Sequence, residues 1–207
     1  MAFLGTLFFV TFGFMKYFSF IFLFVICALP AQIEPPILNL ENSIKIKNTD
    51  AIEKVKLKKN EILISFFQDG GLGYQLDINN FVFKENGKVF HTKERVYYRN
   101  GKKHHAENQK LSRLREVELF EVINSDYFIN FSKLTQANFK ASSKNNQICS
   151  TSFVDDAPTN YIIIKQNNKQ KEISVYLPKA NEYCTEKSST LSKFIKLHNL
   201  FGVQLDW

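Results

Sequence analysis

Glycine is scarce in this sequence, with eight residues in 207, yet three of them lie close together between two apolar runs. These residues are Gly70, Gly71 and Gly73. A dinucleotide-binding loop would need a further glycine where Leu76 stands, and the Gly-Lys-Ser/Thr triplet of a phosphate-binding loop is absent. A strand is expected after the glycines, so no helix N-terminus is available there to bind an anion. We therefore interpret the three glycines as a turn that supplies positive φ angles and whose tip could contact a partner.

Sequence motifs of catalysis are also lacking. The G-x-S-x-G elbow of many serine hydrolases is absent. His104 and His105 are adjacent, so they diverge on any regular element, and no third ligand follows at metal-binding spacing. We interpret the segment around them as a solvated turn, and Asp155 and Asp156 as turn residues that bond the local backbone. The sequence therefore predicts no cofactor, no metal site and no catalytic residue.

Long apolar runs are confined to the N-terminus, where Lys16 is the only charge in residues 1–29. From Met15 the chain has a cationic start, about a dozen apolar residues and a small-residue end, which is typical of a secretory signal peptide. We expect initiation at Met15 and cleavage near Ala31. The alternative is an uncleaved membrane anchor, because residues 3–29 exceed the roughly 20 apolar residues that span a bilayer.

Cysteine is scarce too, and removal of the leader would leave only Cys149 and Cys184. An even pair predicts a disulfide in an exported protein, whereas in a cytosolic protein it would indicate two buried thiols. A hairpin turn centred at Asn167 and Asn168 also places the two cysteines almost opposite one another, beyond the base of the hairpin. We therefore expect a Cys149–Cys184 disulfide that closes a loop of about 35 residues.

The chain divides into a signal peptide at 1–31, a basic lead segment at 32–60 and a single domain at 61–207. The pattern of the lead segment is compatible with a strand followed by a short helix. It is equally compatible with a strand followed by a second strand. In the domain, β-branched, aromatic or alternating residues predict strands. These strands lie at 61–67, 74–84 and 89–99, with a second hairpin at 161–177. The pair Asn86-Gly87 favours a type I′ turn between the second and third strands.

Two helices complete the expected fold. Apolar residues at three- and four-residue steps predict one helix over 111–123 and another that opens at 188–190 and carries Leu191, Phe194 and His198. His198 is interpreted as a packing or surface residue. The order hairpin, helix, hairpin, helix predicts an α+β fold, with an antiparallel sheet built from two hairpins and two helices packed on one face.

Positive charge is concentrated in residues 93–115, where eight basic residues stand against two acidic ones. The predicted partner-binding basic face consists of Arg95, Arg99, Lys102, Lys103 and Arg113. Such a face could bind an acidic protein or an anionic component of the cell envelope, whereas nucleic acid is not expected for an exported chain. Membrane contact is expected only through an uncleaved leader. The alternative is a charged surface that only faces solvent.

Three segments carry a family resemblance: "ILISFFQDGGLGYQLDI", "LREVELFEVINSDYF" and "TNYIIIKQNNKQKEISVY". They resemble small bacterial exported domains with a Gly-Gly turn, a Leu-rich helix and a Tyr-x-Ile-x-Ile hairpin. One branch of these domains is similar to emfourin, a proteinaceous inhibitor of thermolysin-like metalloproteases. The resemblance covers roughly residues 62–201 and implies protease inhibition as one possible activity, without identifying an inhibitory residue.

These observations predict an exported, non-enzymatic domain that binds a partner through loops and the basic face. Periplasmic, cell-surface and extracellular locations are all compatible with the leader, and an uncleaved leader would make an N-terminal membrane anchor. The second interpretation is a protease inhibitor, and the third is a hydrolase whose site is not visible in the sequence. A binding domain should present a charged or aromatic face, an inhibitor an extended loop, and an enzyme a pocket with converging polar groups.

Overall fold

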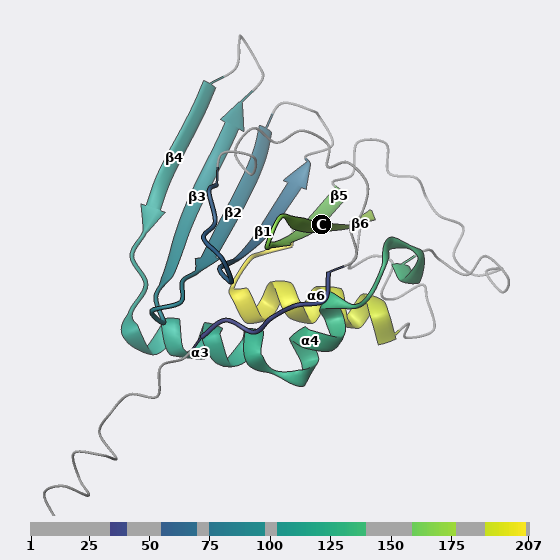
Figure 1. Cartoon of the computed structure of the whole chain (residues 1–207). Coiled ribbons are helices and arrows are strands. Elements are labelled where there is room, and N and C mark those ends of the chain that lie inside the picture. Colours follow the sequence, from purple (N-terminus) through teal and green to yellow (C-terminus); the bar gives the residue numbers. More distant parts are fainter. Residues whose placement is uncertain are drawn as a thin grey trace, which may run out of the picture. The chain divides into compact units, whose positions relative to one another are not determined.

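The computed structural model describes six stretches of the chain, whose arrangement is shown in Figure 1. They are residues 34–40, 55–69, 75–97, 103–139, 159–176 and 189–205. All of them belong to one unit, Glu34–Trp207. The expected leader, residues 1–31, lies outside the described residues. None of the described helices has the length and apolar character that crossing a membrane requires.

The described strands form one antiparallel sheet in the spatial order β4-β3-β2-β1-β5-β6. The strands are β1 (Ile62–Asp69), β2 (Gln75–Phe83), β3 (Val89–Tyr97), β4 (Lys103–Gln109), β5 (Thr159–Gln166) and β6 (Lys169–Tyr176). β1 to β4 pair in sequence order, and β5 pairs with the other side of β1. β1 therefore lies inside the sheet, in agreement with its β-branched and aromatic composition.

The described helices are α3 (Arg113–Asn124), α4 (Asp126–Ser132) and α6 (Ser189–Phe201), and a short 3-10 helix, η1 (Gln136–Phe139), follows α4. At the start of α3, Oγ of Ser112 accepts a hydrogen bond from the amide of Arg115 at 3.2 Å, as serine commonly does at a helix N-cap. α6 begins where the sequence predicts it. Together with the antiparallel sheet, these helices confirm the predicted α+β class.

Strand β4 corrects the interpretation of His104 and His105 as part of a solvated turn. Both histidines lie on β4, which pairs with β3 in antiparallel register. As neighbours on a strand they point to opposite faces of the sheet. The sheet therefore contains more than the two hairpins that the sequence predicts, because β1 to β4 form a four-stranded meander.

The turn between β2 and β3 also differs from the predicted type I′ turn. Gly87 has a φ of 70°, but Asn86 does not share a positive φ. The amide of Gly87 donates to the carbonyl of Lys84 at 3.1 Å, which makes a three-residue loop of a type I turn followed by a left-handed glycine. The longer loop pairs Phe83 with Val89, so Val89 is buried and Phe90 is exposed.

The turn between β5 and β6 lies where it was predicted. Asn167 and Asn168 have φ angles of 50° and 62°, and the strands pair from Gln166 and Lys169 outward. Asparagine tolerates the left-handed region better than most residues, because its short side chain can bond the local backbone. This two-residue turn fixes the register of the hairpin.

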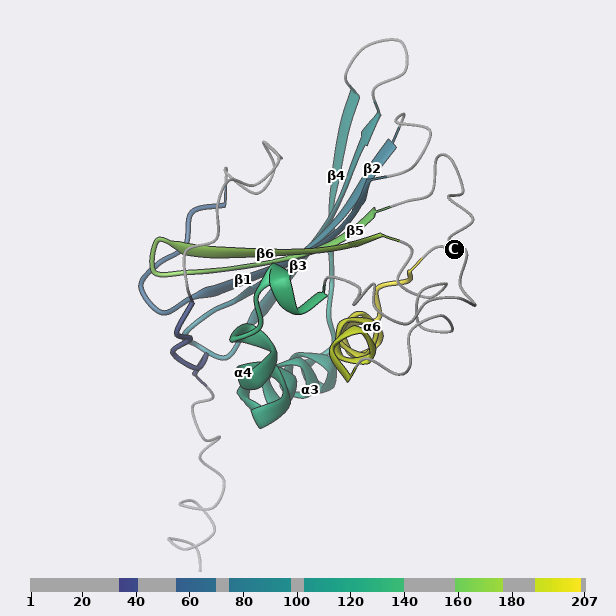
Figure 2. The same ribbon diagram turned by 90° about the vertical axis from the view of Figure 1, so that its right-hand side faces the viewer.

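One face of the sheet, called here the helix face, packs against α3 and α6 (Figure 2). Phe83 of β2 contacts Phe120 of α3, with ring centroids 5.3 Å apart. Phe66 of β1 contacts Phe201 of α6 at 4.9 Å. Phe66, Phe83 and Phe120 are fully buried. These aromatic contacts fix the position of the two helices over one part of this face.

The opposite face carries a second apolar cluster on the same strands. Its buried members are Leu63, Phe67, Leu76, Ile78, Val82, Val96, Tyr161 and Ile163. Val55 and Leu57, from the lead segment, pack against this cluster. Residues 55–60 contain no helix or strand, and residues 41–54 lie outside the described part of the chain.

Gln166, at the end of β5, holds two parts of the lead segment. Its Oε1 accepts a hydrogen bond from the amide of Leu38 at 2.7 Å. Its Nε2 donates to the carbonyls of Pro36 and Asn60, at 2.8 and 3.1 Å. Leu38 and Leu40 are buried. Residues 34–40 therefore belong to the folded unit and do not form a free tail.

Candidate functional site

The helix face changes from apolar to polar along the strands. β2 presents Phe83 and Phe81, which are buried, and then Asn79 and Asp77 with the same orientation. Its neighbours β1 and β3 change in the same direction. α6 ends at Phe201, and the residues that follow it, Gly202 to Gln204, lie beside the polar part of the face.

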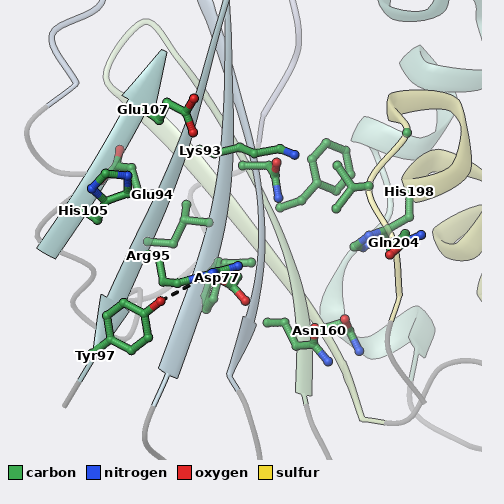
Figure 3. A pocket seen from close by; sticks show the side chains of 17 residues that line it. Asp77, Lys93, Glu94, Arg95, Tyr97, His105, Glu107, Asn160, His198 and Gln204 are labelled. Carbon is green, nitrogen blue, oxygen red and sulfur yellow. Dashed lines mark hydrogen bonds and ion pairs between the residues drawn. The ribbon is translucent and has the colours of Figure 1, made fainter. Parts of the chain in front are cut away.

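A hollow of about 730 Å³ lies over this polar part and extends to the end of α6. Figure 3 shows it from close by. We call it the polar hollow, and its principal side chains are Asp77, Lys93, Arg95, Glu107, Asn160 and His198. Its volume lies in the range of small-molecule sites, roughly 300 to 1,000 Å³. The hollow is therefore large enough for a ligand or for a segment of a partner chain.

The sheet register brings the wall of the hollow together from residues that are distant in sequence. Lys93 stands opposite Asn79 on one side and Glu107 on the other. In the next row, Arg95 stands between Asp77 and His105. Each row thus sets a cation beside a carboxylate, and the wall carries both signs of charge.

Arg95 is held in place within this wall. Its Nε donates to Oδ1 of Asp77 at 2.6 Å, and its Nη1 donates to the hydroxyl of Tyr97 at 3.4 Å. The hydrogen bond that Arg95 donates to Asp77 raises the pKa of Arg95 above its ordinary value, so the guanidinium stays charged. Because both partners of the Arg95–Asp77 pair are largely exposed, the pair orients the guanidinium more than it stabilises the fold.

Lys93 and Glu107 differ from Arg95, because no described residue forms an ion pair with either of them. Figure 3 shows Lys93 extending from β3 toward the side where α6 lies. The ammonium group of Lys93 is therefore the cation of the hollow that is available to a ligand. Among the described residues, no three His, Cys, Asp or Glu side chains are placed to hold a metal ion.

His198 of α6 lies at the floor of the hollow between two aromatic rings. Its ring centroid is 4.8 Å from that of Phe66 and 4.9 Å from that of Phe194. Burial lowers the pKa of His198 from 6.5 to about 3, so the ring is neutral at physiological pH. A neutral imidazole has one donor and one acceptor nitrogen. Neither nitrogen has a hydrogen-bond partner in the part of the chain that the structure describes.

Asn160 is a second buried polar residue at the hollow. It begins the run of apolar residues in β5 and is 1% exposed. Its Nδ2 has no hydrogen-bond partner among the described residues. Leaving a buried donor or acceptor unpaired costs about 1–3 kcal/mol. Two such residues beside one hollow indicate a place where a bound group could supply the missing partners.

The end of α6 fixes the position of His198. The amide of Val203 donates to the carbonyl of His198 at 3.0 Å, and Gly202 has a φ of 69°, which is the usual glycine-terminated helix end. Nη2 of Arg115 donates to the carbonyl of Leu200 at 2.7 Å. A cation at a helix C-terminus is also favourable to the helix dipole. α3 therefore helps to hold the helix end that carries His198.

His91, next to the hollow, is a further neutral histidine. Its ring stacks on that of Phe81 with centroids 4.1 Å apart, and its Nε2 lies 3.2 Å from Oδ1 of Asn79. Burial, and then the charge of Lys93, lower the pKa of His91 to about 4. Unlike His198, His91 has a hydrogen-bond partner, so its polar group is satisfied within the fold.

A row of hydrogen bonds crosses the opposite face of the sheet. Oγ of Ser65 donates to Oδ1 of Asn80 at 2.5 Å, and Nδ2 of Asn80 donates to Oε1 of Glu94 at 2.7 Å. Oε2 of Glu94 lies 2.9 Å from Nε2 of His104. Because Ser65 is fully buried, this row satisfies polar groups inside the fold and does not present a nucleophile to a substrate.

The described residues of the predicted basic face are divided between the two ends of β3. Arg95 lies in the polar hollow, and Lys103 stands opposite Tyr97 in the register of β3 and β4. Arg113 donates to the carbonyl of Gly87 at 2.7 Å, at the other end of β3 from Arg95 and about 20 Å away along the strand. Arg99 and Lys102 lie outside the described residues.

Three further predictions concern residues that the structure does not describe. They are the turn glycines Gly70, Gly71 and Gly73, the cysteines Cys149 and Cys184, and the turn residues Asp155 and Asp156. The strands that flank the glycines, β1 and β2, pair in antiparallel register. The segment after the glycines is therefore a strand, as predicted.

Sequence reasoning missed Asn160 and His198 as site residues. The signal that could have found them is a polar residue at a position that the pattern assigns to the core. Asn160 occupies such a position in β5, and His198 lies on the apolar side of α6. No protein-family model matches the chain, and no curated protein matches it either.

Proposed function

We propose that the protein is a non-enzymatic binding domain that takes part of a partner into the polar hollow. The observation that carries this proposal is the pairing of a ligand-sized hollow with buried, unpartnered polar atoms on Asn160 and His198. Ordered water or a bound group supplies the partner of such atoms when the protein itself supplies none.

The charge of the hollow supports a partner with an anionic group. The ammonium of Lys93 forms no ion pair with a described residue, and the guanidinium of Arg95 is already oriented by Asp77. An acidic protein or an anionic envelope component fits this arrangement, as the basic composition of residues 93–115 also suggests.

Binding is favoured over hydrolysis, although the hollow does contain converging polar groups. A histidine that acts as a general base is normally oriented by a third group and lies within reach of a nucleophile. No described residue bonds to either nitrogen of His198. Protease inhibition, which the emfourin resemblance implies, would use an extended loop in place of a hollow and is a separate proposal.

A charge-reversal pair tests the binding proposal. Lys93→Glu changes the hollow, whereas Lys169→Glu makes the same change in the exposed turn region of β6. The wild-type protein and both variants are immobilised and exposed to an envelope and secreted fraction. We expect Lys93→Glu to lose the captured partner and Lys169→Glu to keep it. Capture that is equal in the two variants would show that the hollow is not the binding site.

We further propose that the protein is exported, cut near Ala31 and stapled by a Cys149–Cys184 disulfide. The leader pattern and the even cysteine pair support this proposal. Intact-mass measurement of the exported form tests the cut, and peptide mapping without reductant tests the disulfide. A mass that retains residues 1–31 would indicate a membrane anchor. Two free thiols would contradict the proposed disulfide.

A further inference from the structure

Given the binding function proposed above, on which this inference rests, we propose that the polar hollow binds a short extended peptide segment. A peptide amide lies against His198, and a carboxylate of the segment lies against Lys93. The hydrogen-bonding groups at the floor indicate the amide, and the spacing of the strands indicates the length of the segment.

An amide matches the polar atoms at the floor of the hollow. Nδ2 of Asn160 is a donor, and neutral His198 adds one donor and one acceptor. A carbonyl of the segment can accept from Nδ2 of Asn160, while an N–H of the segment can donate to the acceptor nitrogen of His198. A carboxylate offers acceptors only, and it would bring a charge between the rings of Phe66 and Phe194. The floor therefore favours the uncharged group.

The strand register gives the distance from the floor to the lysine. Phe66, which lies under the His198 ring, pairs with Asn79, and Asn79 pairs with Lys93. Two strand spacings of about 4.8 Å place Lys93 about 10 Å from the floor. An extended peptide advances about 3.3 Å per residue, so roughly three residues span the distance. Figure 3 shows Lys93 pointing along this direction.

The carboxylates of the wall argue against a dense polyanion as the ligand. A single carboxylate can be placed at Lys93, but a row of phosphates or sulfates would also face Asp77 and Glu107. Like charges placed together in an interface oppose binding. An N-acetylated sugar could supply the amide, but without an acidic group it would leave Lys93 unpaired. A peptide supplies both groups at the required distance.

Two small peptides and one sugar test the assignment on the full chain. The probes are acetyl-trialanine with a free carboxylate, the same peptide with a C-terminal amide, and N-acetylglucosamine, each titrated by NMR chemical-shift perturbation. We expect the acid to bind about tenfold or more tightly than the amide form, the order of a charge-assisted hydrogen bond. Lys93→Met should abolish this difference, whereas the control Lys169→Met should keep it.

Variants of the floor test the amide contact separately. His198→Phe should weaken both peptides by the same factor, because it removes the bond to the amide and leaves Lys93 in place. Asn160→Asp is the alternative test if His198→Phe does not fold. It exchanges the donor for an acceptor at equal size, so it should also weaken both peptides. An undiminished affinity in both floor variants would overturn the amide contact.

The outcomes separate this assignment from the binding function itself. Equal affinity for the acid and amide peptides, or tighter binding of N-acetylglucosamine, would overturn the peptide assignment. If no peptide binds while Lys93→Glu still loses the captured partner, the peptide assignment fails and the binding function stands. If Lys93→Glu captures the partner as well as the wild type, both fail.

Discussion

The buried histidine of α6 should make the stability of the protein depend on pH. The pKa of His198 falls from 6.5 in the unfolded chain to about 3 in the fold, because burial disfavours the charged ring. Below pH 6.5 the unfolded chain therefore binds a proton that the folded chain does not. The contribution of His198 to stability is fully present above pH 6.5 and is lost progressively as the pH falls toward 3.

The size of the effect follows from the two pKa values. Each pH unit below 6.5 reduces the free energy of unfolding by about 1.4 kcal/mol, until the pKa of the folded state is reached. Between pH 8 and pH 5 the loss due to His198 is thus about 2 kcal/mol. With a urea m-value of about 2 kcal/mol/M, this loss shifts the unfolding midpoint by about 1 M.

Urea unfolding of the wild type and of His198→Phe at pH 8 and pH 5 measures this effect. Phenylalanine does not titrate, and it can pack against Phe66 and Phe194. Groups common to both proteins, including His91, cancel when the two pH-dependent changes are subtracted. Phe194→Leu is the matched control, because it should lower the stability by the same amount at both pH values. If His198→Phe loses as much stability on acidification as the wild type, the burial of a neutral His198 is refuted.

Three further predictions concern contacts that hold the fold together. Gln166→Leu removes three hydrogen bonds to the lead segment, so it should lower the free energy of unfolding by about 2–4 kcal/mol and speed proteolysis within residues 34–40. Arg115→Met removes the hydrogen bond to the end of α6 and should lower the free energy of urea unfolding by about 1–3 kcal/mol. An unchanged free energy of unfolding would show that this contact is unimportant. Asn168→Val places a β-branched residue at a φ of 62° and should cost about 1–2 kcal/mol, whereas Asn168→Gly should cost little; equal costs would contradict the turn geometry.

The strands that the sequence predicts best are those with a buried face. β1 and β5 combine β-branched and aromatic residues, and both are largely buried. β4 has the sequence KHHAENQ and is an exposed strand at the edge of the sheet, so neither face imposes an apolar pattern that could reveal it. The turn at Gly87 was misassigned because the Asn-Gly pair suits both a two-residue and a three-residue loop, and only the pairing of Phe83 with Val89 decides between them.

The candidate site was harder to predict than the fold, because its side chains come from different strands and meet only through the register of the sheet. Lys93 and Arg95 were visible as charges, but their neighbours Glu107 and Asp77 come from other strands and depend on the register. His198 reaches the hollow because α6 packs against β1, where the His198 ring contacts Phe66. Nothing local to residue 198 indicates which ring or cavity it will contact.

The contact between Gln166 and the lead segment bears on how the chain can fold while it is being synthesised. The amide of Leu38 and its acceptor on Gln166 are 128 residues apart, so Leu38 receives this partner only after all the residues between them have been made. β1 likewise lacks one of its two neighbours until β5 has been made. A nascent chain that stops before β5 would leave one edge of β1 with unpaired backbone N–H and C=O groups, which is a hazard for aggregation. Such a chain depends on rapid synthesis of β5, or on being shielded until β5 has emerged.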